Sequence, residues 1–492
     1  MIETGTPGKL QQYRRYAIKL LLGRPDTNTP DLQDDTSGHR KSATVADPNL
    51  PGSRAVFALA WPLAVNAIML NGIVIVDTFL VSTLGEEALA SMGLAAAIIA
   101  LLLGTLSALS MATQILVAQG QGANDSVRLK SAFWCGLVLN CAASLLCLLL
   151  VWTFADDVIA YFAHTPSIAT DAVHYLHIFS LVVFGETISQ SISSYFNGTG
   201  RTRLPFYSHL LVIPVNIGLS IVLIYGLYGF PEYGLAGAAL GSAAAAVVRM
   251  LFLICSIVRN DRAVICVAGW AQTTLWRSSQ RHFILALPIA TTFFSQSVAT
   301  VLCTLLYARL SISQFAAMTL IMPWVQVFGQ FMTSWAQATG IFVGQLLGRQ
   351  VASRDLDDFL GRVWRVTFIL AALVSCLHLG ATLSYNWLYN DLQPETRQAL
   401  WSFLPVLLLL SFPKSSNAVC GHTLRAGGDT VYVMNIFVFS QWAIRVPLTA
   451  LFILYLDVSV TWVFALFLVE EIVKFPLFHR RFYSGKWRQL NT

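Results

Sequence analysis

One carboxylate stands inside a stretch that is otherwise apolar for the length of a membrane crossing. Asp77 lies in the run that starts at Trp61, and a bilayer is crossed by about 20 such residues in a helix. A charge at that depth costs at least ~2.5–3.5 kcal/mol, which is typical of an ion or proton site. A carboxylate neutralised by a structural partner is the alternative. We expect a functional role, because the neighbouring spans carry no Lys or Arg at the same depth. Asn66 lies on the same helical face.

The stretch around Asp77 has a counterpart later in the chain. Pro62 and Pro288 are 226 residues apart, and the same offset places Cys303 where the first copy has Asp77. It also relates Met92, Ala112, Thr113, Gln119 and Gly122 to Met318, Ala338, Thr339, Gln345 and Gly348. The chain therefore reads as two copies of one unit, and the ion site is predicted in the first copy alone.

The composition indicates a polytopic membrane protein. Hydrophobic residues make up 56% of the 492 positions and charged residues 11%, with a mean hydropathy of +0.64, far from the averages of soluble proteins. We predict an all-α membrane protein with twelve transmembrane helices in two pseudo-twofold-related six-helix lobes. The expected spans are 55–83, 89–118, 128–153, 170–197, 204–228, 234–258, 282–308, 314–346, 359–386, 397–423, 430–455 and 459–479.

The loops between these spans alternate in basic content. Even-numbered loops and the C-terminus hold seventeen Lys and Arg residues, against two in the odd-numbered loops. The positive-inside rule then places both termini in the cytoplasm. The predicted organisation is a largely disordered tail (1–53), a first lobe (54–258), a cytoplasmic linker (259–281), a second lobe (282–482) and a cytoplasmic tail (483–492). Within the first tail, residues 9–24 form either a basic amphipathic helix on the membrane or an unstructured segment.

Polar side chains recur at helical spacing within several spans. Glu186 and Lys414 are 228 residues apart, so these opposite charges occupy pseudo-symmetric positions. They either pair across a central cleft or bond locally. The candidate cleft residues are Asn66, Glu186, Gln190, Gln296, Gln326, Gln330, Gln337, Lys414 and Asn417. Arg445, Glu470, Glu471 and Lys474 are expected to pair within the second lobe.

The chain shows no constellation typical of an enzyme. It has no Walker loop, no H-E-x-x-H and no G-x-S-x-G. The eight cysteines are scattered without a C-x-x-C motif, which favours free thiols. We therefore expect no cofactor, no nucleic-acid partner, and no metal beyond a possible Na⁺ at Asp77. The expected partners are a small-molecule substrate and the lipid bilayer, and the expected state is a monomer.

Several motifs together resemble the MATE (multidrug and toxic-compound extrusion) family, from Arg54 to Trp487. They are DTFLVSTLGEEALA from Asp77, NGTGRTRLP from Asn197, YGLAGAALGS from Tyr233, LRAGGDT from Leu424, RVPL from Arg445 and SGKW from Ser484. The resemblance implies an exporter of organic, often cationic and aromatic compounds, driven by inward flow of Na⁺ or H⁺.

By this resemblance, the first-lobe carboxylate of the family corresponds to Asp77, with Asn216 and Ser242 beside it. The chain has Ser220 where many relatives carry a carboxylate or Asn. In the second lobe, Gln296 and Lys414 replace acids of several relatives, so no second cation site is expected there. With few oxygen ligands around one charge, H⁺ is favoured, and Na⁺ stays open. A lipid or lipid-linked oligosaccharide flippase and a channel are the alternative functions.

Overall fold

The computed structural model describes residues 50–265, 272–388 and 392–488. The predicted N-terminal tail, apart from its last residues, and the helix considered at 9–24 lie outside these ranges. The first lobe contains α2 (Ser53–Ser82), α3 (Glu86–Gly122), α4 (Ser126–Phe162), α5 (Pro166–Gly198), α6 (Arg203–Tyr225), the short η1 (Leu227–Gly229), α7 (Leu235–Asn260) and α8 (Arg262–Ile265).

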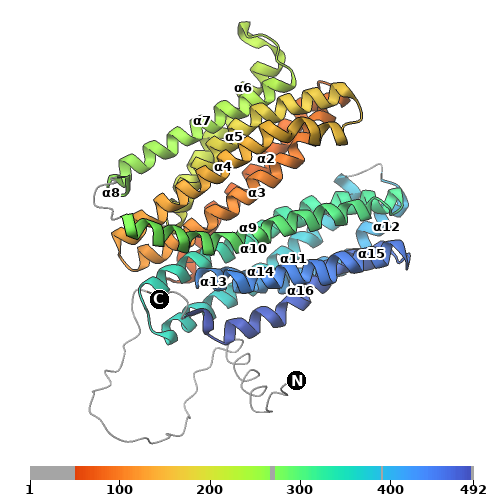
Figure 1. Ribbon diagram of the computed structural model, residues 1–492. Helices are drawn as coiled ribbons and strands as arrows, with labels where there is room; N and C mark the ends of the chain where they lie inside the picture. The colour runs from red at the N-terminus through yellow and green to blue at the C-terminus, as the bar shows by residue number, and fades with distance from the viewer. Residues whose placement is uncertain (1–49, 266–271, 389–391, 489–492) are drawn as a thin grey trace, which may run out of the picture.

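The second lobe repeats this series of long helices. It contains α9 (Gln272–Tyr307), α10 (Ile312–Gly348), α11 (Ser353–Leu388), α12 (Pro394–Ser402), α13 (Leu404–Ala426), α14 (Thr430–Phe439), η2 (Ser440–Arg445), α15 (Val446–Leu454), α16 (Val460–Tyr483) and η3 (Lys486–Arg488). Figure 1 shows the first lobe, in orange to yellow-green, above the second, in green to blue. This all-helical architecture confirms the predicted fold class.

Eleven helical segments of the described chain are long and apolar enough to cross a membrane. The twelfth long helix, α16, carries Glu470, Glu471 and Lys474, and these charges pair with one another inside the second lobe. The segment predicted as the linker, 259–281, is helical over much of its length, because α9 begins at Gln272 rather than near residue 282. Helix α9 thus starts about three turns earlier than the apolar pattern indicates.

Local sequence explains several helix boundaries. The Asp125 carboxylate accepts hydrogen bonds from the backbone N–H groups of Val127 and Arg128, both at 3.0 Å, and so caps α4. Pro405 separates α12 from α13, because proline has no N–H to continue the helix. The span predicted at 430–455 contains a π-helical turn, η2, just before Pro447, and this turn directs Arg445 into the lobe.

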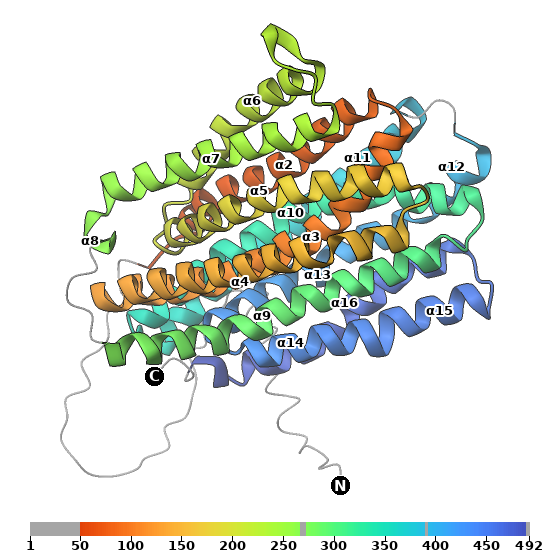
Figure 2. The ribbon, with the colours of Figure 1, turned by 45° about the horizontal axis from the view of Figure 1, so that its top comes forward.

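The two lobes pack against each other along two equivalent seams. Helix α2 contacts α10, and α3 contacts both α9 and α10. We call the end at which α3 and α10 finish the inner end, and the end at which they begin the outer end; the inner end lies at the left in Figure 1 and in the rotated view of Figure 2.

The hydrophobic clusters at the outer end differ from those at the inner end. Toward the outer end, each lobe has its own cluster, around Ile99 and Ile159 in the first and around Phe403 and Phe464 in the second. Toward the inner end, one cluster joins Val56 of α2 to second-lobe residues, and another joins Leu109 of α3 to α9. The lobes are therefore joined at the inner end.

Candidate functional site

Asp77 is buried near the outer end of α2, with 7% of its surface exposed. The Ser242 hydroxyl of α7 donates a hydrogen bond to its Oδ2 atom at 3.5 Å. The Asn216 amide of α6 in turn donates to Ser242 Oγ at 3.0 Å. Three helices that are distant in sequence thus bring Asp77, Asn216 and Ser242 into one chain of contacts.

Ser220 lies one helical turn after Asn216 and packs against the same helix, α7. A Cβ atom added to Gly241 would lie 2.5 Å from Ser220 Oγ, so the glycine allows α6 and α7 to approach closely. The Oδ1 atoms of Asp77 and Asn216 and the Oγ atom of Ser220 are buried, and none has a hydrogen-bond partner within the described chain. Unpaired buried oxygen atoms are costly, so such a cluster is suited to binding a proton or a cation.

No Lys or Arg nitrogen among the described residues lies within 4.0 Å of the Asp77 carboxylate. The recorded ion pairs of the first lobe involve other acids. The pseudo-symmetric Cys303 is buried within the apolar cluster of the second lobe. The geometry therefore matches an acid without a structural counter-charge, although its coupling role stays a prediction.

Asn66 does not join this cluster. It precedes Asp77 by eleven residues on one continuous helix, which separates the two Cα atoms by about 16 Å at 1.5 Å per residue. Its Oδ1 atom is buried without a partner in the described chain. Asn66 and Asp77 thus share one face of α2, as predicted, but they lie at different depths along the helix.

Glu186 forms an ion pair with Arg249 of α7, within its own lobe. Arg249 is 1% exposed, and its other nitrogens donate to Ser208 Oγ and Ser193 Oγ, each at 3.4 Å. The possible pair between Glu186 and Lys414 is therefore wrong: a nearer cation already neutralises Glu186. Sequence reasoning missed Arg249, although a single Arg in the apolar run of span six was a usable signal.

The second lobe holds a compact charged network between α13, η2 and α16. Lys474 Nζ contacts Glu470 Oε1 at 3.0 Å and Glu471 Oε1 at 2.8 Å. Arg445 lies 3.7 Å from Glu470. This confirms the predicted structural pairing. Asn417 also belongs to the network, because its amide donates to the backbone oxygen and Oε2 of Glu471, both at 2.8 Å.

This contact turns the Asn417 amide toward Glu471 of its own lobe, and its assignment as a cleft residue stays a prediction. Lys414 stands three residues earlier on α13, and no carboxylate of the described chain lies within 4.0 Å of its ammonium group. Its Nζ atom lies 3.2 Å from the position of a Cβ on Gly329 of α10. Lys414 is thus a charge placed between α13 and α10 without an ion-pair partner among the described residues.

The predicted glutamines differ in their surroundings. The Gln337 amide of α10 donates to the Gln114 amide of α3 at 2.9 Å and so joins the lobes. Gln296 and Gln326 are exposed. Gln190 and Gln330 are half-buried. These four stay predictions as cleft residues.

At the inner end, two glutamines form reciprocal contacts that sequence reasoning did not assign. Gln119 Nε2 of the first lobe donates to the backbone oxygen of Ala426 at 2.8 Å, and Gln345 Nε2 of the second donates to that of Gly198 at 3.0 Å. The donors are 226 residues apart and the acceptors 228 apart, so the repeat offsets were the available signal. Each acceptor belongs to a helix end, where carbonyl groups lack helical partners.

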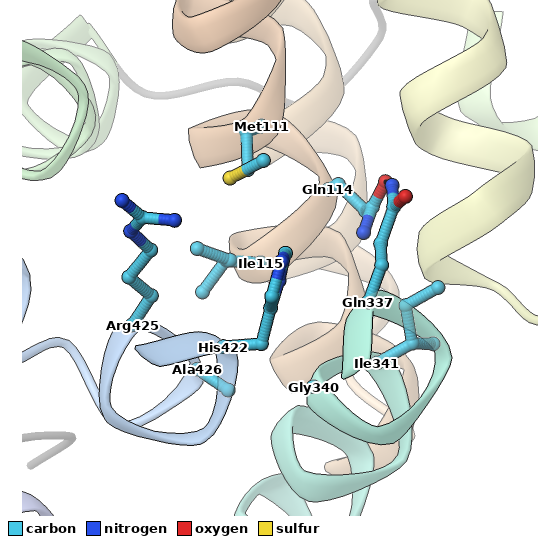
Figure 3. Close-up of a pocket in the computed structure, with 9 residues that line it drawn as sticks. All are labelled: Met111, Gln114, Ile115, Gln337, Gly340, Ile341, His422, Arg425 and Ala426. Carbon is cyan, nitrogen blue, oxygen red and sulfur yellow. The ribbon is translucent and has the colours of Figure 1, made fainter. Parts of the chain in front are cut away.

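A small pocket lies beside these contacts, between the lobes. Met111, Gln114 and Ile115 of α3 line one side, and the remaining lining residues are Gln337, Gly340, Ile341, His422, Arg425 and Ala426. In the view of Figure 3, the Arg425 guanidinium lies on one side of the His422 ring and the two glutamine amides on the other.

Among the described residues, no group of three or more His, Cys, Asp or Glu side chains is arranged to hold a metal ion. The Asp77 cluster contributes one carboxylate, one amide and two hydroxyl groups. Its chemistry is that of a site for a single proton or a monovalent cation.

Comparisons with known proteins agree with this architecture. The sequence profile of the MatE family matches residues 62–222 and 288–451, one segment in each lobe. The chain is 21% identical over 439 residues to the uncharacterized transporter YisQ of Bacillus subtilis, covering 88% of this chain and 95% of that protein. It is 25% identical over 397 residues to the multidrug resistance protein NorM of Vibrio cholerae, covering 79% and 85%.

A solved structure has the same fold. A MOP superfamily transporter from Pyrococcus furiosus, whose binding pocket is described as having reverse polarity, matches with a TM-score of 0.77. The two sequences are 18% identical, and the match covers 89% of this chain and 97% of that one. The likeness therefore shows a shared arrangement of helices across both lobes.

Proposed function

Since this chain belongs to the MatE family of membrane transporters, we propose that it is a secondary antiporter. It exports organic compounds that are amphipathic, aromatic or cationic across the plasma membrane, in exchange for H⁺ or Na⁺. Its relative in Vibrio cholerae is a multidrug resistance protein, which supports this class of substrate.

The observation that carries the proposal is the set of unpartnered oxygen atoms around Asp77. Asp77 Oδ1, Asn216 Oδ1 and Ser220 Oγ are buried without partners in the described chain, while Ser242 links the carboxylate to Asn216. One bound proton or Na⁺ neutralises the single carboxylate. Binding and release of that ion then change the balance of charge at a point where α2, α6 and α7 meet.

The packing of the lobes supports an alternating-access mechanism. The predicted topology places the inner end, with the loop residues Arg128, Lys130, Arg349 and Arg354, in the cytoplasm. The joined inner end then corresponds to a state that is closed toward the cytoplasm. Ion binding at Asp77 acts on the first lobe in this state, and coupling follows if the ion and the cargo prefer different conformations.

An efflux assay tests the proposal and identifies the ion. Everted membrane vesicles are mixed with a fluorescent cationic dye, and dye uptake into the vesicles, which corresponds to export from the cell, is followed under an imposed pH gradient or an imposed Na⁺ gradient. We expect saturable dye movement with one gradient, and collapse of that gradient by a matching ionophore should stop it. Dye movement that ignores both gradients, or that never saturates, would contradict an antiporter and favour a channel.

A further inference from the structure

Arg425 is a buried cation at the junction of the lobes without a counter-charge in the described chain. It lies in the last turn of α13 and is 7% exposed. No carboxylate of the described chain lies within 4.0 Å of its guanidinium, and the nearby Asp429 is paired with Arg481 at 2.5 Å. Burying an unpaired guanidinium is costly, because five N–H donors lose water.

The surroundings compensate this charge only weakly. The guanidinium carbon lies 5.6 Å from the Phe437 ring centre, a contact worth about 0.5–2 kcal/mol. The structure records no hydrogen bond from the Arg425 side chain to the described chain, and none from the His422 ring. Both side chains instead line the pocket between α3, α10 and α13.

The size and lining of this pocket restrict what it can hold. The enclosed part of the pocket is small and has room for about one water-sized group. Met111 and Ile115 form an apolar wall that excludes further water, and the other polar side chains are the amides of Gln114 and Gln337. The residues that line the pocket bring no negative charge, and Arg425 brings a positive one.

We infer that this pocket binds a small anionic group, either an inorganic anion such as chloride or the carboxylate of an organic compound. The Arg425 guanidinium supplies the charge and a planar set of donors, and His422 and the Gln337 amide supply further polar contacts. A cation site at Asp77 and an anion site at Arg425 are compatible, because Asp77 lies near the outer end of α2 whereas the pocket lies toward the inner end, between the lobes.

Because the pocket lies between the lobes, a bound anion also affects how the lobes are arranged. Met111, Gln114 and Ile115 belong to the first lobe, whereas Arg425, His422 and Gln337 belong to the second. The lining is complete only while the lobes are joined at the inner end. A bound anion therefore favours the joined conformation. This consequence for transport rests on the proposed function, whereas the binding itself does not.

Thermal unfolding of the purified full-length protein tests the site. Potassium chloride replaces the potassium salt of morpholinoethanesulfonate, a bulky anion that carries no carboxylate, at constant ionic strength. Wild-type protein should show a saturable rise of the unfolding midpoint by about 2–3 °C at a hundredfold excess over the half-saturating concentration. A parallel titration with sodium benzoate, first in the sulfonate buffer and then with chloride present, separates the two sources of the anion.

Arg425→Gln should abolish the saturable rise, and Arg309→Gln, which changes an exposed arginine, should retain it. A rise with chloride alone assigns an inorganic ion. A rise with benzoate that chloride suppresses assigns the acidic end of an organic compound. If wild type shows no saturable rise with either, or if Arg425→Gln shows the same rise, the inference is overturned.

Two further variants decide the matter if Arg425→Gln does not yield folded protein. Arg425→Lys keeps the charge but loses the planar fork, and His422→Leu removes a polar neighbour. Each should raise the half-saturating concentration of the effective anion several-fold, and an unchanged value in both would overturn the inference. If the wild-type protein binds the anion but shows no gradient-driven dye transport, the proposed function is rejected and the anion site is retained.

Discussion

Gly122 lies so close to the backbone of Gln345 that a Cβ atom on the glycine would meet the Gln345 carbonyl oxygen at 1.9 Å. The pseudo-symmetric contact is equally tight: a Cβ on Gly348 would lie 2.1 Å from the carbonyl oxygen of Gln119. The obstacles are backbone atoms, so no side-chain rotation relieves them. The joined inner end therefore requires glycine at both positions.

Gly122→Ala should prevent the lobes from joining at the inner end. Overpacking of this kind typically costs about 1–3 kcal/mol, and a backbone obstacle places this site at the upper end. We expect the initial rate of gradient-driven dye efflux to fall at least about tenfold, with Gly348→Ala behaving alike because it meets the equivalent obstacle.

Gly104→Ala is the matched control, because it lies on the same helix and a Cβ there meets no atom within 4 Å. It should transport at the wild-type rate. Wild-type efflux by Gly122→Ala, with normal expression and insertion, would show that the inner end need not close as described.

The hydrogen bonds of Gln119 and Gln345 also stabilise the joined inner end, but each contributes less free energy than the glycine contacts. Gln345→Leu removes the bond to the Gly198 oxygen and leaves a buried carbonyl unsatisfied, at a cost of about 1 kcal/mol. Hydrogen–deuterium exchange of peptides around residues 198–202 should then be about fivefold faster. Gln326→Leu, at an exposed position, should leave this exchange unchanged. Equal exchange in both variants would refute the assignment.

The large-scale architecture was predictable because a bilayer imposes a simple rule. A membrane-spanning helix must be apolar over about 20 residues, so the positions of the spans could be predicted from the apolar runs. The two lobes could be predicted from the 226-residue offset. The same rule says little about helix ends. It placed the start of α9 near residue 282, because the preceding turns are polar, whereas the helix begins at Gln272.

Pairing between side chains was harder to predict from the sequence, because it depends on which helices become neighbours. Glu186 and Lys414 occupy equivalent positions, yet Arg249 lies nearer to Glu186 and neutralises it. By contrast, Lys474 follows Glu470 by four residues and Glu471 by three on one helix, so its pairing with both followed from helical geometry alone. The cross-lobe contacts of Gln119 and Gln345 needed the packed structure.

Glu186→Gln should lower the thermal stability strongly, because it leaves the buried charge of Arg249 unpaired. Removing one partner of a buried pair costs about 3–5 kcal/mol. A double-mutant cycle of Glu186→Gln with Arg249→Gln should be clearly non-additive. The corresponding cycle of Glu186→Gln with Lys414→Gln should be additive. Coupling in the second cycle, without coupling in the first, would contradict the observed pair.

Lys474→Gln should destabilise the second lobe, because Lys474 is the cation that contacts both Glu470 and Glu471. Glu470 then keeps Arg445, at 3.7 Å, whereas Glu471 has no ion-pair partner in the described chain and keeps the hydrogen bond from the Asn417 amide. We expect a loss of about 3 kcal/mol or more, seen as a lower unfolding midpoint and poor yield. Glu395→Gln, at an exposed position, serves as the control. A stable Lys474→Gln protein would show that the network contributes little.

The most direct measurement compares gradient-driven dye efflux by wild type and Asp77→Asn in everted vesicles, with Asp156→Asn as the control. Asp156 is exposed near the end of α4, so its variant should retain full activity. Asparagine keeps the size of Asp77 but can neither carry the charge nor exchange a proton. We predict that Asp77→Asn inserts normally and loses efflux under the driving gradient. Undiminished gradient-driven efflux by Asp77→Asn would contradict the assignment of the coupling site.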